Sequence, residues 1–382
     1  MEGRAGGGAG RQDQRSGAAT DDQRSDAANE GQRSGAVTRE QRTAAAMRDQ
    51  RRRPRAIVPA LALVAVVIAF AVVPPLIGGF LIRALTGYLI FGLLALSVGL
   101  ITGYGRLFNL GVGANFGISA YAVAILSQYD ITNPFVLVLC ALGAGVLVAL
   151  LFAFYAVVAS GTEYLMLTFL TTLAFSVAPL TAPSFTGGDN GLSVKGGLAV
   201  SFGLNPLRGN EFYWFVLAIV VLAAAVSWFV VASQTGKAIV AIGRNPQRAA
   251  AMGYSVARYR IALTIYSSVI ASLGGWLYVL QNTFVHQDLL GLVSSTNGLV
   301  YALIGGVNTI LGPLIGATFL RYLNDVLSRG STQSSLYIGI VLMLVVYVMP
   351  DGVLGLWRRF TTRRAQAPRY APRDLEPAVP AK

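Results

Sequence analysis

Charged residues are scarce in this chain: Asp, Glu, Lys and Arg make up 12% of its 382 residues, whereas hydrophobic residues make up 54%. A soluble domain usually carries roughly 25% charged residues. Much of the charge lies at the two ends, so the middle contains long apolar windows, several of which approach the roughly 20 residues that a membrane-spanning helix needs. The scarcity of charge argues against a soluble fold and predicts an all-α, polytopic membrane helix bundle.

Cysteine and histidine are nearly absent, with one residue of each type, Cys140 and His286. This excludes a disulfide framework and a Cys/His metal cluster. We expect His286 and its neighbour Asp288 to lie in a solvated outer turn, and no Ser/His/Asp arrangement is available, so we expect no catalytic residue and no metal. A phosphate-binding G-x-x-x-x-G-K-[ST] loop is also missing, because its nearest relative, Gly236-Lys237, continues with Ala238.

The formal net charge of +13 could suggest a nucleic-acid partner, but the basic residues cluster beside apolar runs and do not alternate with aromatic residues. Such clusters mark the cytoplasmic side of a membrane protein. The tail before the first span, the loop 233–260 and the C-terminal end are all basic with few acids, so they should face the cytoplasm. The loop 181–211, where acids offset the bases, should face outward. We therefore expect a multi-pass protein of the cell (inner) membrane, with both termini cytoplasmic and no nucleic-acid partner.

Ten segments are candidate membrane spans, an even number that agrees with two cytoplasmic termini. They are Ile57 to Leu76, Ala84 to Ile101, Leu107 to Ser127, Phe135 to Ala159, Tyr164 to Leu180, Phe212 to Val231, Ile261 to Leu280, Leu290 to Gly306, Ile310 to Leu327 and Ser335 to Met349. The third, eighth and ninth are rich in Gly, Ser and Asn and can be short, broken or re-entrant. Eight spans with one re-entrant pair would satisfy the charges equally well. The transmembrane domain should cover residues 56–357.

Both ends of the chain are predicted to be cytoplasmic tails. Residues 1–55 repeat a Gln-Arg-Ser/Thr motif with a nine-residue period. That period places the copies on no common face of a helix or a strand, and core-forming side chains are missing, so we expect this tail to be disordered. Residues 358–382 form a second, basic tail.

The basic loop before the seventh span contains a predicted short helix. Asn245 is a favoured N-cap, Pro246 suits the first helical position, and Gly253 suits the left-handed residue that commonly ends a helix. The result is a helix of about two turns, roughly 10 Å long, which would be marginal alone in water. It either packs against its own membrane domain or docks on another protein, to which Met252 would offer an adaptable apolar contact. The other residues of this candidate coupling helix are Arg248, Ala249 and Ala250.

Separate blocks between Ser97 and Trp357 share their order and spacing with a known family. The blocks are Ser233 to Ala238, Asn245 to Gly253, Val256 to Arg260, Asn109 to Gly111, Phe116 to Tyr121, Thr186 to Leu192, Ile304 to Gly306, Gly312-Pro313, Gly316-Ala317, Pro350 to Gly352 and Gly355 to Trp357. On these blocks the chain resembles the permease subunits of ABC-type branched-chain amino acid importers, specifically the longer of their two permeases. One departure is the acidic residue that often precedes the Ala pair, where this chain has Gln247 and Arg248.

The resemblance implies a transport subunit, and not an enzyme, that provides half of a pathway for leucine, isoleucine and valine. Its coupling helix would dock in a groove of an ABC ATPase subunit. ATP would be bound by that partner, so the chain needs no cofactor of its own. The other implied partners are a second permease subunit and an external substrate-binding protein. A permease for urea, short amides or another small polar nutrient is the closest alternative. An ion-coupled secondary transporter is disfavoured, because the clear spans contain almost no carboxylates or histidines.

Two further groups of residues are site candidates. Asn109, Asn115, Ser119 and Tyr121 either line the pathway, offering neutral hydrogen bonds to a zwitterion, or belong to a segment of small residues that lets helices pack closely. The second group, Gly188, Asp189 and Asn190, is expected to lie in a sharp outer turn, and the family resemblance makes it a candidate contact for the external binding protein.

Overall fold

The computed structural model describes residues 79–131, 133–194, 210–330 and 339. All of them belong to one of the two units into which the chain divides, Ala71–Lys382. The predicted span Ile57 to Leu76 and both predicted tails lie outside the described residues, and so does the span Ser335 to Met349 apart from residue 339.

Eight of the predicted spans fall within the described residues, and each coincides with a helix. The helices are α3 (Gly79–Gly99), which continues as the π-helix η2 (Leu100–Tyr104), α4 (Val112–Gln128), α5 (Pro134–Val158), α6 (Thr162–Thr181), α8 (Asn210–Ala232), α11 (Val256–Asn282), α12 (Leu292–Gly305) and α13 (Leu311–Gly330). Five of the described helices are long and apolar enough to cross a membrane, namely α3 with η2, α5, α6, α8 and α11. The Gly- and Ser-rich helices α4 and α12 are short, as expected, with 17 and 14 residues. The described residues therefore form a helix bundle suited to a membrane.

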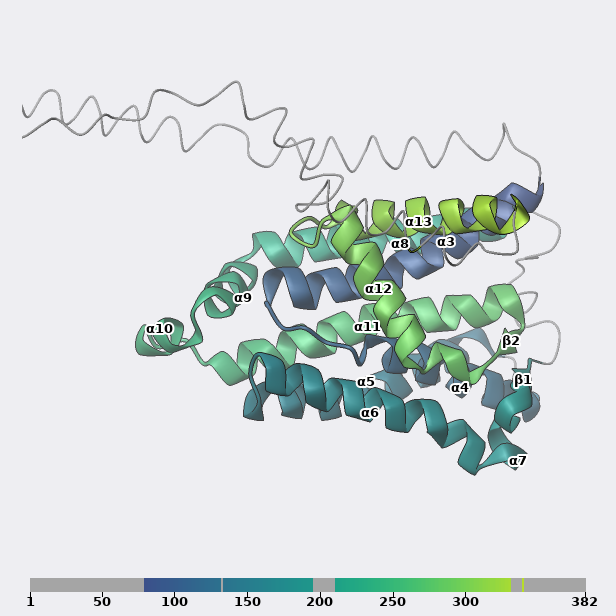
Figure 1. Ribbon diagram of the computed structural model, residues 1–382, viewed down its shortest axis with the longest axis horizontal. Helices are drawn as coiled ribbons and strands as arrows, with labels where there is room; N and C mark the ends of the chain where they lie inside the picture. The colour runs from purple at the N-terminus through teal and green to yellow at the C-terminus, as the bar shows by residue number, and fades with distance from the viewer. Residues whose placement is uncertain (1–78, 132, 195–209, 331–338, 340–382) are drawn as a thin grey trace, which may run out of the picture. The chain divides into compact units, whose positions relative to one another are not determined.

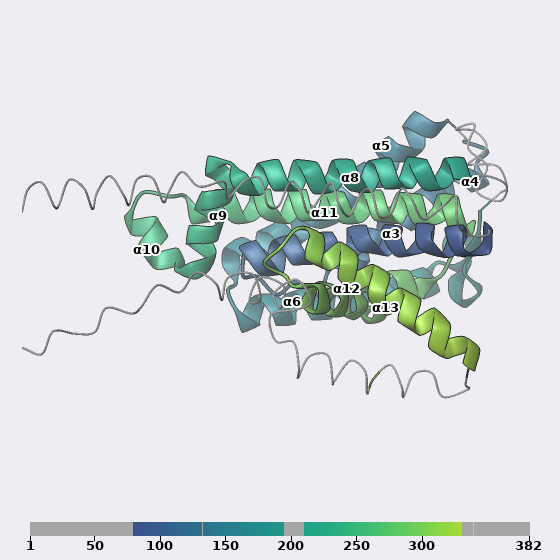
Figure 2. The same ribbon diagram turned by 90° about the horizontal axis from the view of Figure 1, so that it is seen from above.

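The core lies where α3, α4 and α11 cross. In the most apolar stretch of α3, 89% of the residues are buried, and in that of α11, 72%. Helix α11 packs along α5, α4 and α3 (Figure 2). A Cβ on Gly275 of α11 would lie 2.1 Å from the carbonyl oxygen of Phe116 on α4, so the close crossing requires a glycine there. The rings of Phe91, Phe116 and Tyr278, one from each helix, meet with centroids between 5.6 and 5.8 Å apart.

Helix α13 packs against α3 and carries charged side chains into that contact. The Arg321 guanidinium lies 3.4 Å from the centroid of the Phe91 ring, a cation–π contact. Asp325, one turn further on, accepts a hydrogen bond from the hydroxyl of Tyr88. Both charges thus have partners on α3, which compensates for their low solvation beside an apolar helix.

Helices α5, α6 and α8 present apolar side chains outward. Only 33%, 22% and 33% of the residues in their most apolar stretches are buried. Leu147, Leu170 and Leu222 are between 61% and 70% exposed. Apolar surface on this scale is unfavourable in water and suits contact with lipid or with another membrane subunit.

The bundle has two different ends, which α11 connects (Figure 1). At one end, α9 (Gln234–Arg244) and α10 (Pro246–Ala251) precede α11. At the other lie α7 (Pro183–Thr186) and a strand pair, in which β1 (Leu192–Ser193) runs antiparallel to β2 (Phe284–Val285). The 27 residues of α11 separate the two ends by roughly 40 Å. The basic loop and the described part of the loop predicted to face outward therefore lie at opposite ends. The sequence did not predict α7, α9 or the strand pair. Within the described residues, the strand pair is where the structure departs from the expected all-α fold.

Candidate docking helix and outer loop cluster

Helix α10 has the local structure that its sequence predicts. The Asn245 side chain accepts a hydrogen bond from the backbone N–H of Arg248 at 2.9 Å, and Pro246 occupies the start of the helix. The helix ends at Ala251, and Gly253 has a φ of +87°, in the left-handed region. The N-cap, the first-position proline and the terminating glycine are thus confirmed, although the helix has six residues, slightly less than the predicted two turns.

Most of α10 is exposed. Ala249 is its buried residue, with 1% of its surface accessible, and its carbonyl accepts hydrogen bonds from the backbone N–H groups of Met252 and Tyr254. Arg248 and Ala250 are exposed, and Met252 is 63% exposed. The helix is therefore anchored by one small side chain and presents its other faces outward.

Helix α9 connects α10 to the bundle. The Ser233 side chain caps it by accepting a hydrogen bond from the N–H of Gly236 at 3.3 Å. Ala238, Ile239 and Ile242 are buried on one face of the helix. Sequence reasoning missed α9, although two signals were available: a serine N-cap and apolar residues at helical spacing.

The surface of the α9–α10 end is positively charged. Lys237, Arg244, Arg248 and Arg258 are all exposed, and the chain contains no Asp or Glu between residues 212 and 282. Arg260 differs from this group, because it is only partly exposed and its Nη1 donates a hydrogen bond to the carbonyl oxygen of Ala156 on α5 at 3.0 Å. A partner that covers the four exposed cations must supply negative charge.

The four candidate pathway residues are all buried. Asn115 and Ser119 are 0% accessible, Asn109 is 3% and Tyr121 is 5% accessible. The Asn109 side chain accepts a hydrogen bond from the N–H of Gly111 at 2.6 Å, and the Ser119 hydroxyl donates to the carbonyl of Asn115 at 2.8 Å. Within the described part of the chain, Asn115 Oδ1 and the Tyr121 hydroxyl have no hydrogen-bond partner. Three of the four lie on α4 and the fourth lies just before it, so the structure brings them to one helix but not to an open surface.

The small residues of α4 lie at helix crossings. The N–H of Gly113 donates to the hydroxyl of Ser295 on α12 at 3.0 Å. A Cβ on Gly145 of α5 would lie 1.8 Å from the Ser272 hydroxyl of α11 and 3.0 Å from that of Ser119. These contacts favour the interpretation that the segment serves close helix packing.

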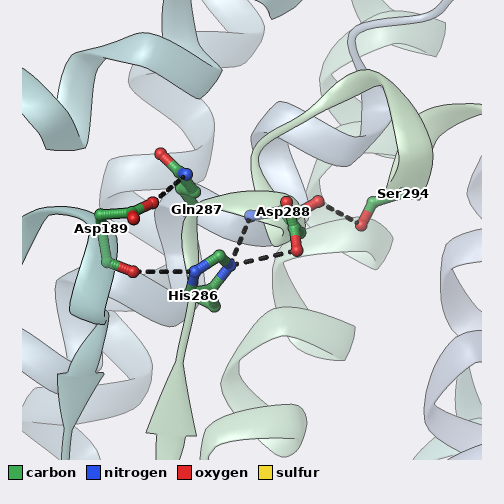
Figure 3. Close-up of polar contacts among 5 residues, drawn as sticks. All are labelled: Asp189, His286, Gln287, Asp288 and Ser294. Carbon is green, nitrogen blue, oxygen red and sulfur yellow. Dashed lines mark hydrogen bonds and ion pairs between the residues drawn. The ribbon is translucent and has the colours of Figure 1, made fainter.

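At the opposite end, two loops that are far apart in sequence form one polar cluster, the outer loop cluster (Figure 3). The Asp189 carbonyl oxygen lies 3.0 Å from Nε2 of His286, and its carboxylate accepts a hydrogen bond from Gln287 at 2.9 Å. His286 Nδ1 lies 3.1 Å from the Asp288 carboxylate, and the Asp288 carbonyl accepts a hydrogen bond from the Ser294 hydroxyl at 2.9 Å. His286 is therefore held against the other loop, a contact that the expected solvated turn does not include.

The predicted outer turn forms the 3-10 helix η3 (Gly188–Asn190) within this cluster. Asp189 and Asn190 are exposed, whereas Gly188 is buried. Of the three candidate contacts for a binding protein, only Asp189 and Asn190 are thus exposed.

These features define an integral membrane protein with an exposed, basic helix at one end and an ordered loop cluster at the other. The chain belongs to the family described as "Branched-chain amino acid transport system / permease component", whose family model matches residues 80–350. It is therefore an ABC-type permease subunit, a transport component rather than an enzyme. Membership of this family implies ATPase, second-permease and substrate-binding partners.

Curated relatives resemble the chain over between one third and about three quarters of its length. The fructose import permease protein FrcC of Rhizobium meliloti is 24% identical, covering 78% of this chain and 85% of that protein. The high-affinity branched-chain amino acid transport system permease protein LivM of Escherichia coli (strain K12) is also 24% identical, covering 78% of this chain and 75% of that protein. The autoinducer 2 import system permease protein LsrC of Klebsiella pneumoniae is 28% identical over 33% of this chain and 36% of that protein. No solved structure matches the chain at a significant level. The relatives carry different substrates in their names, so likeness to them does not define the substrate.

Proposed function

We propose that this chain is the transmembrane permease subunit of an ATP-driven importer that carries leucine, isoleucine and valine delivered by an external binding protein. In this proposal it crosses the cell membrane ten times, with both termini in the cytoplasm. The observation that supports it best is the exposed helix α10, which stands at the end of the bundle opposite the outer loop cluster (Figure 1). A helix this short with one buried residue needs a partner to hold it.

The charge of the α9–α10 end indicates what that partner must offer. The four exposed cations have no acidic residue near them in sequence, and a cation that loses water on docking needs a carboxylate opposite it. We therefore expect the groove of the ATPase subunit to be acidic, with a carboxylate facing Arg248. Arg248 lies near the position where the family often has an acid, so the docking contact of this chain would depend on a cation. ATP itself would be bound by the ATPase subunits.

In the proposed importer, the external binding protein docks on the outer loop cluster. Asp189 and Asn190 are exposed there, and Asp189 is held on both its carbonyl and its carboxylate by His286 and Gln287. A turn that is already ordered loses less conformational entropy when it binds.

Within this proposal, Asn109, Asn115, Ser119 and Tyr121 remain the candidate lining of the pathway. They are covered in the present structure, so substrate would reach them only after α4 separates from α11 or α12. A pathway covered in one state is compatible with an importer, because a pathway open to both sides at once would leak. The second permease subunit would complete the pathway.

A sugar is the second candidate substrate, since the fructose permease of Rhizobium meliloti is as similar to this chain as LivM is. The deciding experiment is uptake of radiolabelled leucine and fructose into cells that co-express this chain with candidate ATPase, second-permease and binding-protein partners from its own genome. Leucine uptake that disappears when the ATPase is inactivated by mutation supports the branched-chain proposal. If fructose but not leucine is taken up in an ATP-dependent manner, the chain is a permease subunit of a sugar importer. Uptake that survives ATPase inactivation contradicts the importer proposal.

A further inference from the structure

The last turn of the central helix α3 is wound differently from the rest. The helix is α-helical from Gly79 to Gly99 and then continues as the π-helix η2, Leu100–Tyr104. Leu100, Ile101 and Thr102 are buried. π-helical turns are rare and are frequently found at functional sites. This one lies at the end of α3 that faces α9.

One side of η2 is in direct contact with α9. A Cβ on Gly243 of α9 would lie 2.8 Å from the carbonyl oxygen of Tyr104 and 3.0 Å from that of Gly105, so the two backbones touch at this glycine. Ile239 of α9 belongs to the same buried apolar cluster as Ile101 of η2 and Leu263 of α11. Helix α9 leads into α10, the candidate docking helix, so α10 is connected to η2 through α9. At Gly243 the contact between α9 and η2 is backbone against backbone, with no flexible side chain between them.

A second side of η2 contacts the turn between α12 and α13. A Cβ on Gly103 would lie 1.8 Å from the carbonyl oxygen of Val307, so backbone meets backbone here too. The Tyr104 hydroxyl donates a hydrogen bond to the carbonyl of Asn308 at 3.4 Å. Five residues of π-helix are thus held between α9 and the α12–α13 turn.

Helix α12 leads from that turn to the outer loop cluster. Its 14 residues cover roughly 21 Å. At its other end, the Ser294 hydroxyl donates to the carbonyl of Asp288 within the outer loop cluster (Figure 3). A displacement of the α12–α13 turn therefore acts on a helix that is tied to the far end of the bundle.

We propose that η2 is the joint that transmits movement of the α9–α10 unit to the α12–α13 turn, with Gly243 and Gly103 as its two points of contact. This inference rests on the proposed function, because an ATPase docked on α10 supplies the movement. Close-packed backbones transmit a displacement with little loss, since packed interiors have low compressibility. Substituting either glycine separates the surfaces and weakens the transmission.

The test compares Gly243→Ala with Gly143→Ala in the complex with the ATPase, second permease and binding protein. Alanine at 243 places a Cβ within 3.0 Å of two backbone oxygens, so α9 must move away from η2. Gly143 lies in α5, and beyond the backbone of its own helical turns no atom lies within 4 Å of the position that a Cβ would take there, which makes it a matched control. We expect Gly243→Ala to assemble and to hydrolyse ATP while substrate taken up per ATP falls about tenfold, the size of a typical coupling between sites. We expect Gly143→Ala to behave as wild type.

A second measurement follows the movement of the α12–α13 turn directly. Spin labels at Asn308→Cys, in the α12–α13 turn, and Val158→Cys, at the end of α5, are introduced into a Cys140→Ser background; both positions are accessible. We expect the distance between the labels to change when ATP binds, and the change to disappear in Gly243→Ala. An unchanged distance in a transporting complex, or unchanged uptake per ATP in Gly243→Ala, would contradict the proposal that η2 transmits the movement. Neither result would contradict the proposed importer function. A wild-type complex with no ATP-dependent uptake at all overturns the proposed function and the joint with it.

Discussion

Replacement of Asn245 by alanine tests whether α10 acts as a preformed helix. The Asn245 side chain accepts the hydrogen bond from Arg248 at 2.9 Å, and Ala249 is the helix's buried anchor. Loss of an N-cap costs about 1 kcal/mol. A free-energy change of about 1.4 kcal/mol is tenfold in an equilibrium constant, so about 1 kcal/mol corresponds to roughly fivefold. If docking requires the helical form, affinity for the ATPase subunit falls by up to this factor.

The assay is the equilibrium affinity of the ATPase subunit for the chain in lipid nanodiscs, measured alongside ATP-dependent uptake. Asn245→Ser is the matched control, because serine is also a favoured N-cap. We expect the serine variant to bind nearly as well as wild type and the alanine variant to bind several-fold more weakly. A serine variant as weak as the alanine variant would refute the capping argument, since the amide itself would then contact the partner. An alanine variant with unchanged affinity would show that docking does not depend on a preformed helix.

Four further outcomes are expected. Ala250→Glu places an acid on the exposed face of α10, against a groove that is expected to be acidic. ATP-dependent uptake should therefore fall about tenfold or more, while membrane insertion, measured by fractionation, stays normal. The control variant Ala250→Ser should retain uptake. Asp189→Ala removes the carboxylate that Gln287 contacts at 2.9 Å and should weaken binding-protein affinity about fivefold, a net hydrogen bond's contribution, whereas Asp189→Asn keeps an acceptor and should bind normally. Gly145→Ala places a Cβ 1.8 Å from the Ser272 hydroxyl and should destabilise the protein by about 1 to 3 kcal/mol, seen as a lower Tm in detergent, while Gly143→Ala should not lower it. The purified chain alone should hydrolyse no ATP, and robust uptake driven by an ion gradient in its reconstituted vesicles would contradict the importer assignment.

The features predicted correctly from the sequence depend on local chemistry. Each membrane helix in the described residues is marked by its own apolar composition, and α10 is marked by Asn245, Pro246 and Gly253, which act within one or two turns. Helix α9 was missed because its short amphipathic pattern joins directly to the apolar run of α8.

The candidate site depends on contacts that composition cannot reveal. Asp189 and His286 are 97 residues apart in sequence, and the pairing of β1 with β2 helps to bring their loops together. Likewise, the polar residues of α4 suggest an aqueous surface, yet Asn115 is fully buried because α4 packs between α11 and α12. The sequence shows which side chains are polar, whereas tertiary packing decides which of them meet solvent.

Helix α3 occupies the centre of the bundle although it precedes the described helices that cover it. Its partners α8, α11, α12 and α13 all follow it in the chain. During synthesis α3 therefore enters the membrane before these partners exist and first meets lipid. Its buried polar side chains tolerate lipid, because Thr86 donates to the carbonyl of Ile82 and Ser97 to that of Leu94, both within the helix. The same helical surface thus contacts lipid during insertion and protein after assembly, and its hydrophobic composition is compatible with both environments.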